Sequence, residues 1–386
     1  MVDAPSHADL PSPPDSRIDI DPFASLPDGL CGGSRKLSPT VIKPYASKPC
    51  GKGCKQVTFG NFVELHYDVV GDQLVYIGER GTGYKVYLVD LKSSTEYRLH
   101  PNFAKKGQGC SLVHTDGKQP TYTCVRGGFP DTKVWLRSIT TYDPSTQMAT
   151  DRHCYKRKLS NKGCFPDYVC TGSTGVGLND SMGACIKQDM WFYRFSDGSF
   201  TNLTKAYGGV WQGHMSGHRL VWTQVNAGWP STQVVIHDTK TNKQWRVDPA
   251  SGSQYLPRIE GDQVVWTDHR NAKGGMWMPG NSDIYYANLT SGKKLAVTTH
   301  SAMQERPDVW GDWVVWMDWR SAAATTKKNA DIYAKNIKTG KVFPIAATSA
   351  TEAYPRIDND RVFYTMPDNK GEISLFMVDL KVRLSP

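Results

Sequence analysis

The chain has 386 residues, with 35 glycines, 23 prolines, 12 tryptophans, 18 tyrosines and a formal net charge of +9. This turn-rich, aromatic-rich composition is typical of a β protein. The sequence contains no run of about 18 apolar residues, so we predict no membrane span. The positive charge favours a polyanionic partner, and simple solubility explains it equally well.

Residues 1–45 are rich in Pro, Ser and Asp, and we expect them to form a poorly ordered leader or linker. The opening sequence MVDAPSHADLPSPPDSRIDIDPF lacks the basic and then apolar pattern of a signal peptide. We interpret it as a mature N-terminus with an added Met. Residues 46–386 are expected to form one domain.

From residue 54 onward, a unit of four short strands recurs along the chain. Its clearest copies begin with YLPRIEGDQVVWTDHR (residues 255–270) and ERPDVWGDWVVWMDWR (residues 305–320). Five clear copies and two degenerate ones make seven units of roughly forty to fifty residues, a period typical of propellers and solenoids. Four strands per unit, with regular turns between them, favour a β-propeller.

The two ends of the repeat region argue for a closed ring rather than a solenoid. The last copy stops after its third strand, ISLFMVDL (residues 373–380), and a spare strand, CKQVTF (residues 54–59), precedes the first copy. Pairing of these two segments hides two open sheet edges. We therefore predict an all-β, seven-bladed β-propeller closed by an N-terminal strand completing the last blade.

Two segments of the chain resemble the TolB-like propeller repeat: GDQVVWTDHR…SDIYYANLTSGKK and GDWVVWMDWR…ADIYAKNIKTGK. The resemblance extends over about residues 54–384. The resemblance implies the propeller fold. It says little about function, because this fold carries binding modules, peptidase gates and lyases. Two groups with this repeat, the oligogalacturonate lyases and the ulvan lyases, are enzymes. The chain does not match either group's complete active-site pattern residue by residue, so no catalytic residue is transferred from them.

All nine cysteines lie in the first half of the chain, at positions 31, 50, 54, 110, 124, 154, 164, 170 and 185. This density predicts disulfides in an oxidising compartment, and therefore a secreted or periplasmic protein. The alternative is a set of buried free thiols in a cytosolic protein. Zinc is not expected, since Cys50-x-x-x-Cys54 has no second pair at ligand spacing. Residues 140–183 depart from the repeat and are predicted to form a Cys-rich insertion, stapled by disulfides and capping part of one face.

Aligning the copies on their Gly-Asp turns places one residue of each innermost strand at the same height in the central channel. These residues are Asp68, His114, Asp180, His214, Arg258, Asp308 and Arg356. Two positions earlier, on the same side of each strand, come His66, Leu112, Leu178, Gln212, Leu256, Arg306 and Tyr354. Histidine beside arginine and carboxylate favours a ligand site. The alternative is a polar channel whose charges neutralise one another.

The longest regular loops join the second and third strands of two copies, at residues 269–282 and 319–330. They contribute a predicted ligand-binding rim made of His269, Arg270, Trp277, Trp319 and Arg320. Arginines and aromatic rings suit an acidic sugar polymer, through charge-assisted hydrogen bonds and stacking. The alternative is that Asp-x-Arg belongs to the repeat and ties blade to blade. Trp222, Trp266 and Trp316 recur at one strand position and are predicted to lie in the core.

These observations favour a binding module that presents its charged channel to an anionic polysaccharide or to a protein partner. His66, Asp68, Arg306 and Asp308 are then ligand-binding residues, together with the rim. The alternative is a polysaccharide lyase that cleaves a uronic-acid polymer by β-elimination.

In the lyase alternative, Arg258 or Arg356 neutralises the carboxylate, His214 removes the proton and Tyr354 protonates the leaving oxygen. His114 is a spare base. No cofactor is predicted, although a divalent metal held by His66, His114 and His214 is a further alternative. No helical DNA reader is present, so nucleic acid is not an expected partner.

Overall fold

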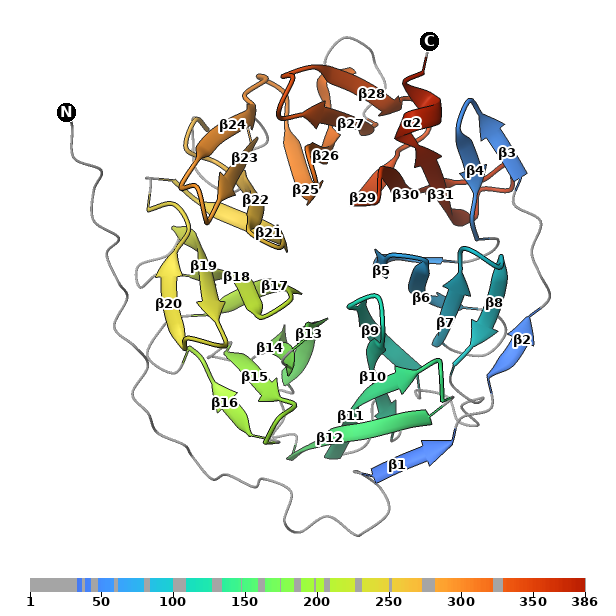
Figure 1. The fold of residues 1–386 in the computed structure, drawn as a ribbon, viewed down its shortest axis with the longest axis vertical. Helices are drawn as coiled ribbons and strands as arrows, with labels where there is room; N and C mark the ends of the chain where they lie inside the picture. Colours follow the sequence, from blue (N-terminus) through green and yellow to red (C-terminus); the bar gives the residue numbers. More distant parts are fainter. Residues whose placement is uncertain are drawn as a thin grey trace.

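The computed structural model describes most of the chain beyond residue 32. The described residues are 33–36, 39–42, 48–58, 62–79, 84–99, 109–126, 134–146, 148–158, 164–173, 175–183, 189–197, 199–204, 209–225, 231–249, 252–272, 282–321 and 329–385. They form seven antiparallel sheets arranged around a common centre (Figure 1). The predicted all-β propeller arrangement is confirmed.

Three sheets come from the first half of the chain, and in each of them the first-named strand is the innermost. The first contains β5 (Phe62–Val70), β6 (Gln73–Glu79), β7 (Tyr84–Asp90), β8 (Thr95–Arg98) and β2 (Thr40–Ile42). The second contains β9 (Gly109–Thr115), β10 (Pro120–Arg126), β11 (Val134–Asp143), β12 (Met148–Lys158) and β1 (Gly33–Lys36). The third contains β13 (Cys164–Thr171), β14 (Gly175–Gly183), β15 (Met190–Arg194) and β16 (Phe200–Asn202).

The remaining four sheets follow the repeat closely. The fourth contains β17 (Val210–Ser216), β18 (Arg219–Val225), β19 (Thr232–Asp238) and β20 (Lys243–Arg246). The fifth contains β21 (Gln254–Glu260), β22 (Gln263–Asp268), β23 (Asp283–Asn288) and β24 (Lys294–Thr298). The sixth contains β25 (Gln304–Trp310), β26 (Trp313–Asp318), β27 (Asp331–Asn336) and β28 (Val342–Ala346). The seventh contains β29 (Ala353–Asp358), β30 (Arg361–Pro367), β31 (Ile373–Asp379), β4 (Cys54–Gln56) and β3 (Lys48–Gly51).

The two ends of the propeller meet in the seventh sheet. β4 pairs antiparallel with β31, with Gln56 opposite Phe376 and Cys54 opposite Val378. A disulfide joins Cys50 to Cys54 in the β3–β4 hairpin. The short helix α2 (Leu380–Arg383) follows β31. Among the described residues, no helix is long and apolar enough to cross a membrane.

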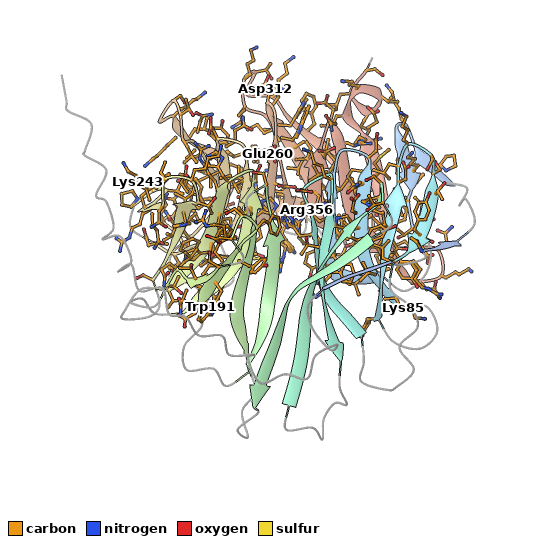
Figure 2. The ribbon with its side chains drawn as sticks, turned by 60° about the horizontal axis from the view of Figure 1, so that its bottom comes forward. Lys85, Trp191, Lys243, Glu260, Asp312 and Arg356 are labelled. Atoms are coloured by element: carbon orange, nitrogen blue, oxygen red, sulfur yellow. A yellow bond between two sulfur atoms is a disulfide. The ribbon has the colours of Figure 1, made fainter. Side chains whose placement is uncertain are left out.

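The hydrophobic core is divided among the interfaces between neighbouring sheets. Six buried clusters occur in the described part of the chain, and each joins side chains of two adjacent sheets. The cluster that contains Tyr67 and Phe363 packs the seventh sheet against the first. The predicted core residues Trp222, Trp266 and Trp316 are fully buried. Figure 2 shows Arg356 near the centre of the ring and Lys243 near its outer edge.

Two predictions about chain organisation are wrong. Residues 140–183 are not an irregular insertion, because β11, β12, β13 and β14 occupy most of this segment and belong to the second and third sheets. The leader does not end at residue 45, since β1 and β2 pair with the outer strands β12 and β8. Residues 1–32 lie outside the described residues. These segments lack the Gly-Asp turn and the aromatic strand ending, so the repeat pattern could not identify them as strands.

The alignment of the third unit was also wrong. Its innermost strand is β13, whereas Asp180 and Leu178 lie on the second strand, β14, where Asp180 pairs with Pro166. The turn that follows the inner strand lies at Gly172 and Ser173, so residues 178–183 belong to the second strand and not to the inner one. Asp180 is therefore not a channel residue.

Candidate functional site

A cavity of about 60 Å³ lies at the centre of the ring, where the innermost strands converge. Most of the predicted channel residues line it. They are His66, Asp68, His114, Gln212, Leu256, Arg258, Arg306, Tyr354 and Arg356. His214, the fifth residue assigned to catalysis in the lyase alternative, lies beside them, with its ring against that of His114. Asp308 does not belong to this lining, and the Leu112 side chain lies outside the described residues.

The inner strands share a local distortion that faces this cavity. Gln212, Leu256, Arg306 and Tyr354 have positive φ angles of 45°, 54°, 55° and 54°. The pairing register of each of their strands shifts at this point. A left-handed conformation at a residue other than glycine costs on the order of 1–3 kcal/mol and often marks a functional position. Here it turns four side chains of equivalent strands toward the same cavity.

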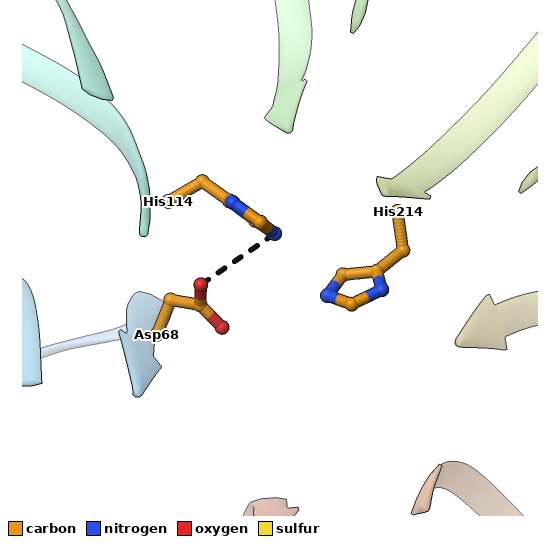
Figure 3. A group of neighbouring side chains, drawn as sticks. All are labelled: Asp68, His114 and His214. Atoms are coloured by element: carbon orange, nitrogen blue, oxygen red, sulfur yellow. Dashed lines mark ion pairs between the residues drawn. The ribbon is translucent and has the colours of Figure 1, made fainter. Parts of the chain in front are cut away.

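Two histidines and one aspartate, Asp68, His114 and His214, form a compact polar cluster at the cavity (Figure 3). His114 Nε2 lies 3.5 Å from Asp68 Oδ2, and the His114 and His214 ring centroids are 5.0 Å apart. One ligand atom from each of the three residues fits within a 4.8 Å group. His214 Nδ1 lies 3.1 Å from the Ile259 carbonyl oxygen.

Burial disfavours the charged form of both imidazoles. Burial lowers the pKa of His114, and the Asp68 carboxylate opposes this only in part. Burial lowers the pKa of His214 further, and the positive charge of Arg258 adds to the effect. A neutral imidazole can accept a proton or bind a metal ion, so both functions remain open to this pair.

Three guanidinium groups line the same cavity, those of Arg258, Arg306 and Arg356. Asp68 contributes the single carboxylate of the lining. Arg306 lies over the Tyr354 ring at 4.6 Å, and Arg356 lies over the Tyr67 ring at 5.6 Å. Arg356 Nη1 donates to the Pro355 carbonyl oxygen at 2.8 Å. Its Nε is buried and has no hydrogen-bond partner within the described chain. The cavity therefore has an excess of positive charge and a buried donor directed toward no acceptor.

Some channel residues also hold neighbouring sheets together. Asp68 Oδ2 accepts the Thr115 backbone N–H at 2.9 Å, and Asp308 Oδ2 accepts the Ile357 N–H at 3.0 Å. Each bond runs from one innermost strand to the next. Burial raises the pKa of Asp308, while Arg258 and Arg356 oppose this shift. For Asp308 the structure favours a structural role over contact with a ligand.

The two rim arginines, Arg270 and Arg320, form hydrogen bonds with carboxylates that belong to the repeat. Arg270 Nη2 donates to Asp268 Oδ2 at 2.6 Å and to Asp248 Oδ2 at 2.7 Å, and its guanidinium lies 3.9 Å from the Tyr285 ring centroid. Burial alone would lower the pKa of Arg270, but the hydrogen bonds to these two carboxylates raise it. Asp268 also accepts the N–H of the buried Trp266 at 2.8 Å.

The sixth sheet repeats this arrangement. Arg320 donates to Asp318 at 2.7 Å and lies 4.3 Å from the Tyr333 ring centroid. Asp318 accepts the Trp316 N–H at 2.7 Å. Trp319 packs at the edge of a core cluster, and Trp277 lies outside the described residues. The geometry favours the structural alternative for Arg270 and Arg320, since their guanidinium groups already have carboxylate partners.

Sequence reasoning missed three polar residues around the cavity. Tyr67 lines it and donates its hydroxyl hydrogen to backbone carbonyls of the seventh sheet, including Phe363 O at 3.1 Å. Tyr255 and Glu305 lie beside it and hydrogen-bond each other. Alignment on the turn selected every second residue of the inner strands, so it passed over these positions.

No protein-family model matches the sequence, and no curated protein matches it significantly. Solved propeller structures do match. Oligogalacturonate lyase from Vibrio parahaemolyticus has a TM-score of 0.60 at 11% identity, covering 90% of this chain and 98% of that chain. An oligogalacturonate lyase in complex with manganese has a TM-score of 0.59 at 12% identity, covering 91% and 98%.

The β-propeller domain of the Trilobed protease from Pyrococcus furiosus has a TM-score of 0.55 at 11% identity, covering 83% of this chain and 96% of that chain. At these identities, the likeness shows the propeller fold alone. It includes lyases and a protease domain, so the function must be argued from the site.

Proposed function

We propose that this protein is a propeller binding module whose central cavity holds a carboxylate of an anionic carbohydrate. The observation that carries the proposal is the convergence of Arg258, Arg306 and Arg356 on one cavity with a single lining carboxylate. The buried Arg356 Nε supplies a donor that lacks a partner among the described residues. Guanidinium groups recognise carboxylates through charge-assisted hydrogen bonds, which are the strongest hydrogen bonds that side chains offer.

The size of the cavity limits what can enter. A volume of about 60 Å³ is equivalent to only a few water molecules, because one water needs about 10–15 Å³ by this measure. A carboxylate fits into this space, whereas a complete sugar ring does not. The polymer would therefore lie across the mouth of the channel, with one acidic group directed inward.

The same proposal places the protein in an oxidising compartment. The Cys50–Cys54 disulfide is of the kind that persists in secreted and periplasmic proteins. We propose that the protein is secreted or periplasmic, where acidic polysaccharides are accessible to it. Analysis of free thiols under non-reducing conditions tests this location: full alkylation of all nine cysteines in freshly isolated native protein would contradict it.

Binding is tested by calorimetric titration with polygalacturonate, and with neutral dextran as the control ligand. We expect binding to polygalacturonate only, and a loss of about tenfold to a hundredfold in affinity for Arg356→Gln, since a hydrogen bond to a charged group is worth about 1.5–3 kcal/mol. Arg383→Gln removes the same charge from an exposed helix position and should bind normally. Equal affinities for the two variants would overturn the proposal.

A polysaccharide lyase is the second candidate, and the neutral His214 beside Arg258 favours it. In β-elimination, Arg258 or Arg356 would neutralise the uronate carboxylate and so acidify the C5 proton. His214 would take that proton, with His114 as an alternative base, and Tyr354 would protonate the leaving oxygen. Incubation with polygalacturonate, ulvan and glycosaminoglycans, followed by ultraviolet absorbance of the unsaturated product, tests this. If none of these polymers yields an unsaturated product, the lyase is refuted and only the binding function remains.

Asp68, His114 and His214 would hold a divalent metal ion if the cavity contains one. Two imidazoles and a carboxylate suit a transition metal, and one ligand atom from each of the three residues lies within 4.8 Å of the others. A bound metal would act as a Lewis acid toward a carboxylate. The oligogalacturonate lyase in complex with manganese supports this assignment. Elemental analysis of purified wild-type protein and of His114→Ala tests it.

A further inference from the structure

Three side chains beside the central cavity form a continuous hydrogen-bonded chain that the proposed anion site does not use. Tyr255 Oη lies 2.6 Å from His269 Nε2 and donates to Glu305 Oε1 at 3.1 Å. The Tyr255 and His269 rings meet edge to face, with centroids 5.0 Å apart. All three side chains are half-buried. A phenol thus lies directly between an acid and a base.

The propeller repeat does not require these residues. Tyr255 and Glu305 occupy equivalent positions at the start of β21 and β25, where the fourth sheet has Trp211 and the seventh has Ala353. His269 follows β22, and Trp319 follows β26 at the equivalent position. By contrast, the Trp and Asp that bind each other recur unchanged in these two sheets. The hydrogen-bonded chain is therefore particular to the boundary between the fifth and sixth sheets.

Two members of the cluster directly precede cavity-lining residues in the sequence. Tyr255 precedes Leu256 and Glu305 precedes Arg306, and both following residues line the cavity. The nearest charged groups are the Arg306 guanidinium, which acts on Glu305 and Tyr255, and the Asp268 carboxylate, which acts on His269.

The hydrogen bonds allow two arrangements that differ by one proton. With Glu305 ionised, Tyr255 donates to Glu305, and His269 Nε2–H donates to the Tyr255 oxygen. With Glu305 protonated, Glu305 donates to the Tyr255 oxygen, Tyr255 donates to His269 Nε2, and Nδ1 carries the imidazole hydrogen. A proton that arrives at Nδ1 is thereby delivered to Glu305 by transfer along both bonds, without any oxidation or reduction.

We propose that Glu305, Tyr255 and His269 form a proton relay at the edge of the cavity, which takes up one proton from the solvent when a carboxylate binds there, because a second negative charge nearby disfavours the ionised form of Glu305. Burial raises the pKa of Glu305 and lowers the pKa of His269, so the two groups are closer in proton affinity than they are in water. Burial also raises the pKa of Tyr255, which keeps the phenol protonated as the link between them. His269 Nδ1 is buried and has no hydrogen-bond partner among the described residues, which leaves it available for the hydrogen.

The relay itself can be tested without a ligand, by nuclear magnetic resonance of the histidine side chains in the full chain. In the wild type, the His269 hydrogen should move from Nε2 to Nδ1 as Glu305 takes up a proton with falling pH. Tyr255→Phe and Glu305→Gln should each abolish this coupled change. Tyr285→Phe, a matched substitution on the same sheet, should retain it. If His269 titrates identically in the wild type and in Tyr255→Phe, there is no relay.

The proton uptake on ligand binding depends on the proposed function and is tested separately. Calorimetric titration with galacturonate in two buffers of different ionisation enthalpy gives the number of protons exchanged on binding. We expect one proton for the wild type and none for Tyr255→Phe, with similar affinities. Failure of galacturonate to bind would refute the anion site, and the resonance experiment would still decide the relay. Binding without proton uptake in the wild type would refute this response of the relay to the ligand.

Discussion

Glu352 offers the sharpest test of the electrostatic reasoning, because its side chain is completely buried just before β29. Oε1 accepts hydrogen bonds from the Thr348 backbone N–H at 3.2 Å and from its hydroxyl. Oε2 is buried without a hydrogen-bond partner among the described residues, and so is Asp331 Oδ2. At the equivalent positions, four residues before the channel residue, the fifth and sixth sheets have Gln254 and Gln304.

Burial raises the pKa of Glu352 from 4.5 to about 6, and the nearby charge of Asp331 contributes to the increase. The raised value means that the folded state disfavours the ionised form. The cost is absent below pH 4.5, grows as the pH rises, and is complete above pH 6. It amounts to about 2 kcal/mol of unfolding free energy, since one pKa unit is worth about 1.4 kcal/mol.

Glu352→Gln removes this cost, because the neutral amide cannot ionise and keeps an oxygen that can accept from Thr348. We expect the variant to be more stable than the wild type by about 2 kcal/mol at pH 8 and nearly unchanged at pH 4.5. Urea unfolding across this pH range measures the difference. The converse variant, Gln304→Glu, should lose stability as the pH rises. An equal effect of Glu352→Gln at both pH values would refute the reasoning, because a packing change does not titrate.

The remaining predictions concern the fold. Asp318→Ala leaves the buried Trp316 indole N–H and the Arg320 guanidinium without their acceptor. It should lower the unfolding free energy by about 3–5 kcal/mol in urea titrations. Asp312→Ala, at an exposed position, should cost little, and similar losses for the two variants would contradict the role assigned to Asp318. Gly117→Ala brings a new Cβ within 2.8 Å of Val70 at a positive φ of 82°. Gly292→Ala meets the same backbone penalty, about 1–2 kcal/mol, in open space. Gly117→Ala should therefore be the more destabilising of the two by thermal unfolding, and the reverse order would mean that Val70 does not confine this turn.

The sequence predicted most of the channel because two regularities fix the register of an inner strand. Side chains alternate with a period of two, and the turn after the strand marks where to start counting. Asp68, Arg258 and Arg356 were found in this way, and the structure brings all three to the cavity. The same procedure failed at Asp180, since the third unit has no recognisable Gly-Asp turn.

Contacts between sheets could not be predicted, because they depend on how neighbouring strands are placed in space. The repeat aligns Tyr255 with Glu305, fifty residues further along the chain, but it does not show that the two side chains meet. For the same reason, the sequence allows both a ligand-binding and a structural role for Arg270. The hydrogen bond from Arg270 to Asp248, which follows β20 of the fourth sheet, favours the structural role. One signal was present and was not used. In three inner strands the left-handed residue precedes a proline, as in Leu256-Pro257, and this repeated pairing could have indicated the distortion.

The hydrogen bonds from Asp68 and Asp308 to the backbone of the following strand restrict how this protein can diverge. A substitution at either position removes a hydrogen bond between two neighbouring sheets. It therefore destabilises the fold, whatever its effect on ligand preference. Leu256 and Arg306 face the cavity without such a side-chain bond to the next strand in the described chain. Relatives with different ligand specificities should therefore vary first at Leu256 and Arg306, while Asp68 and Asp308 should be retained.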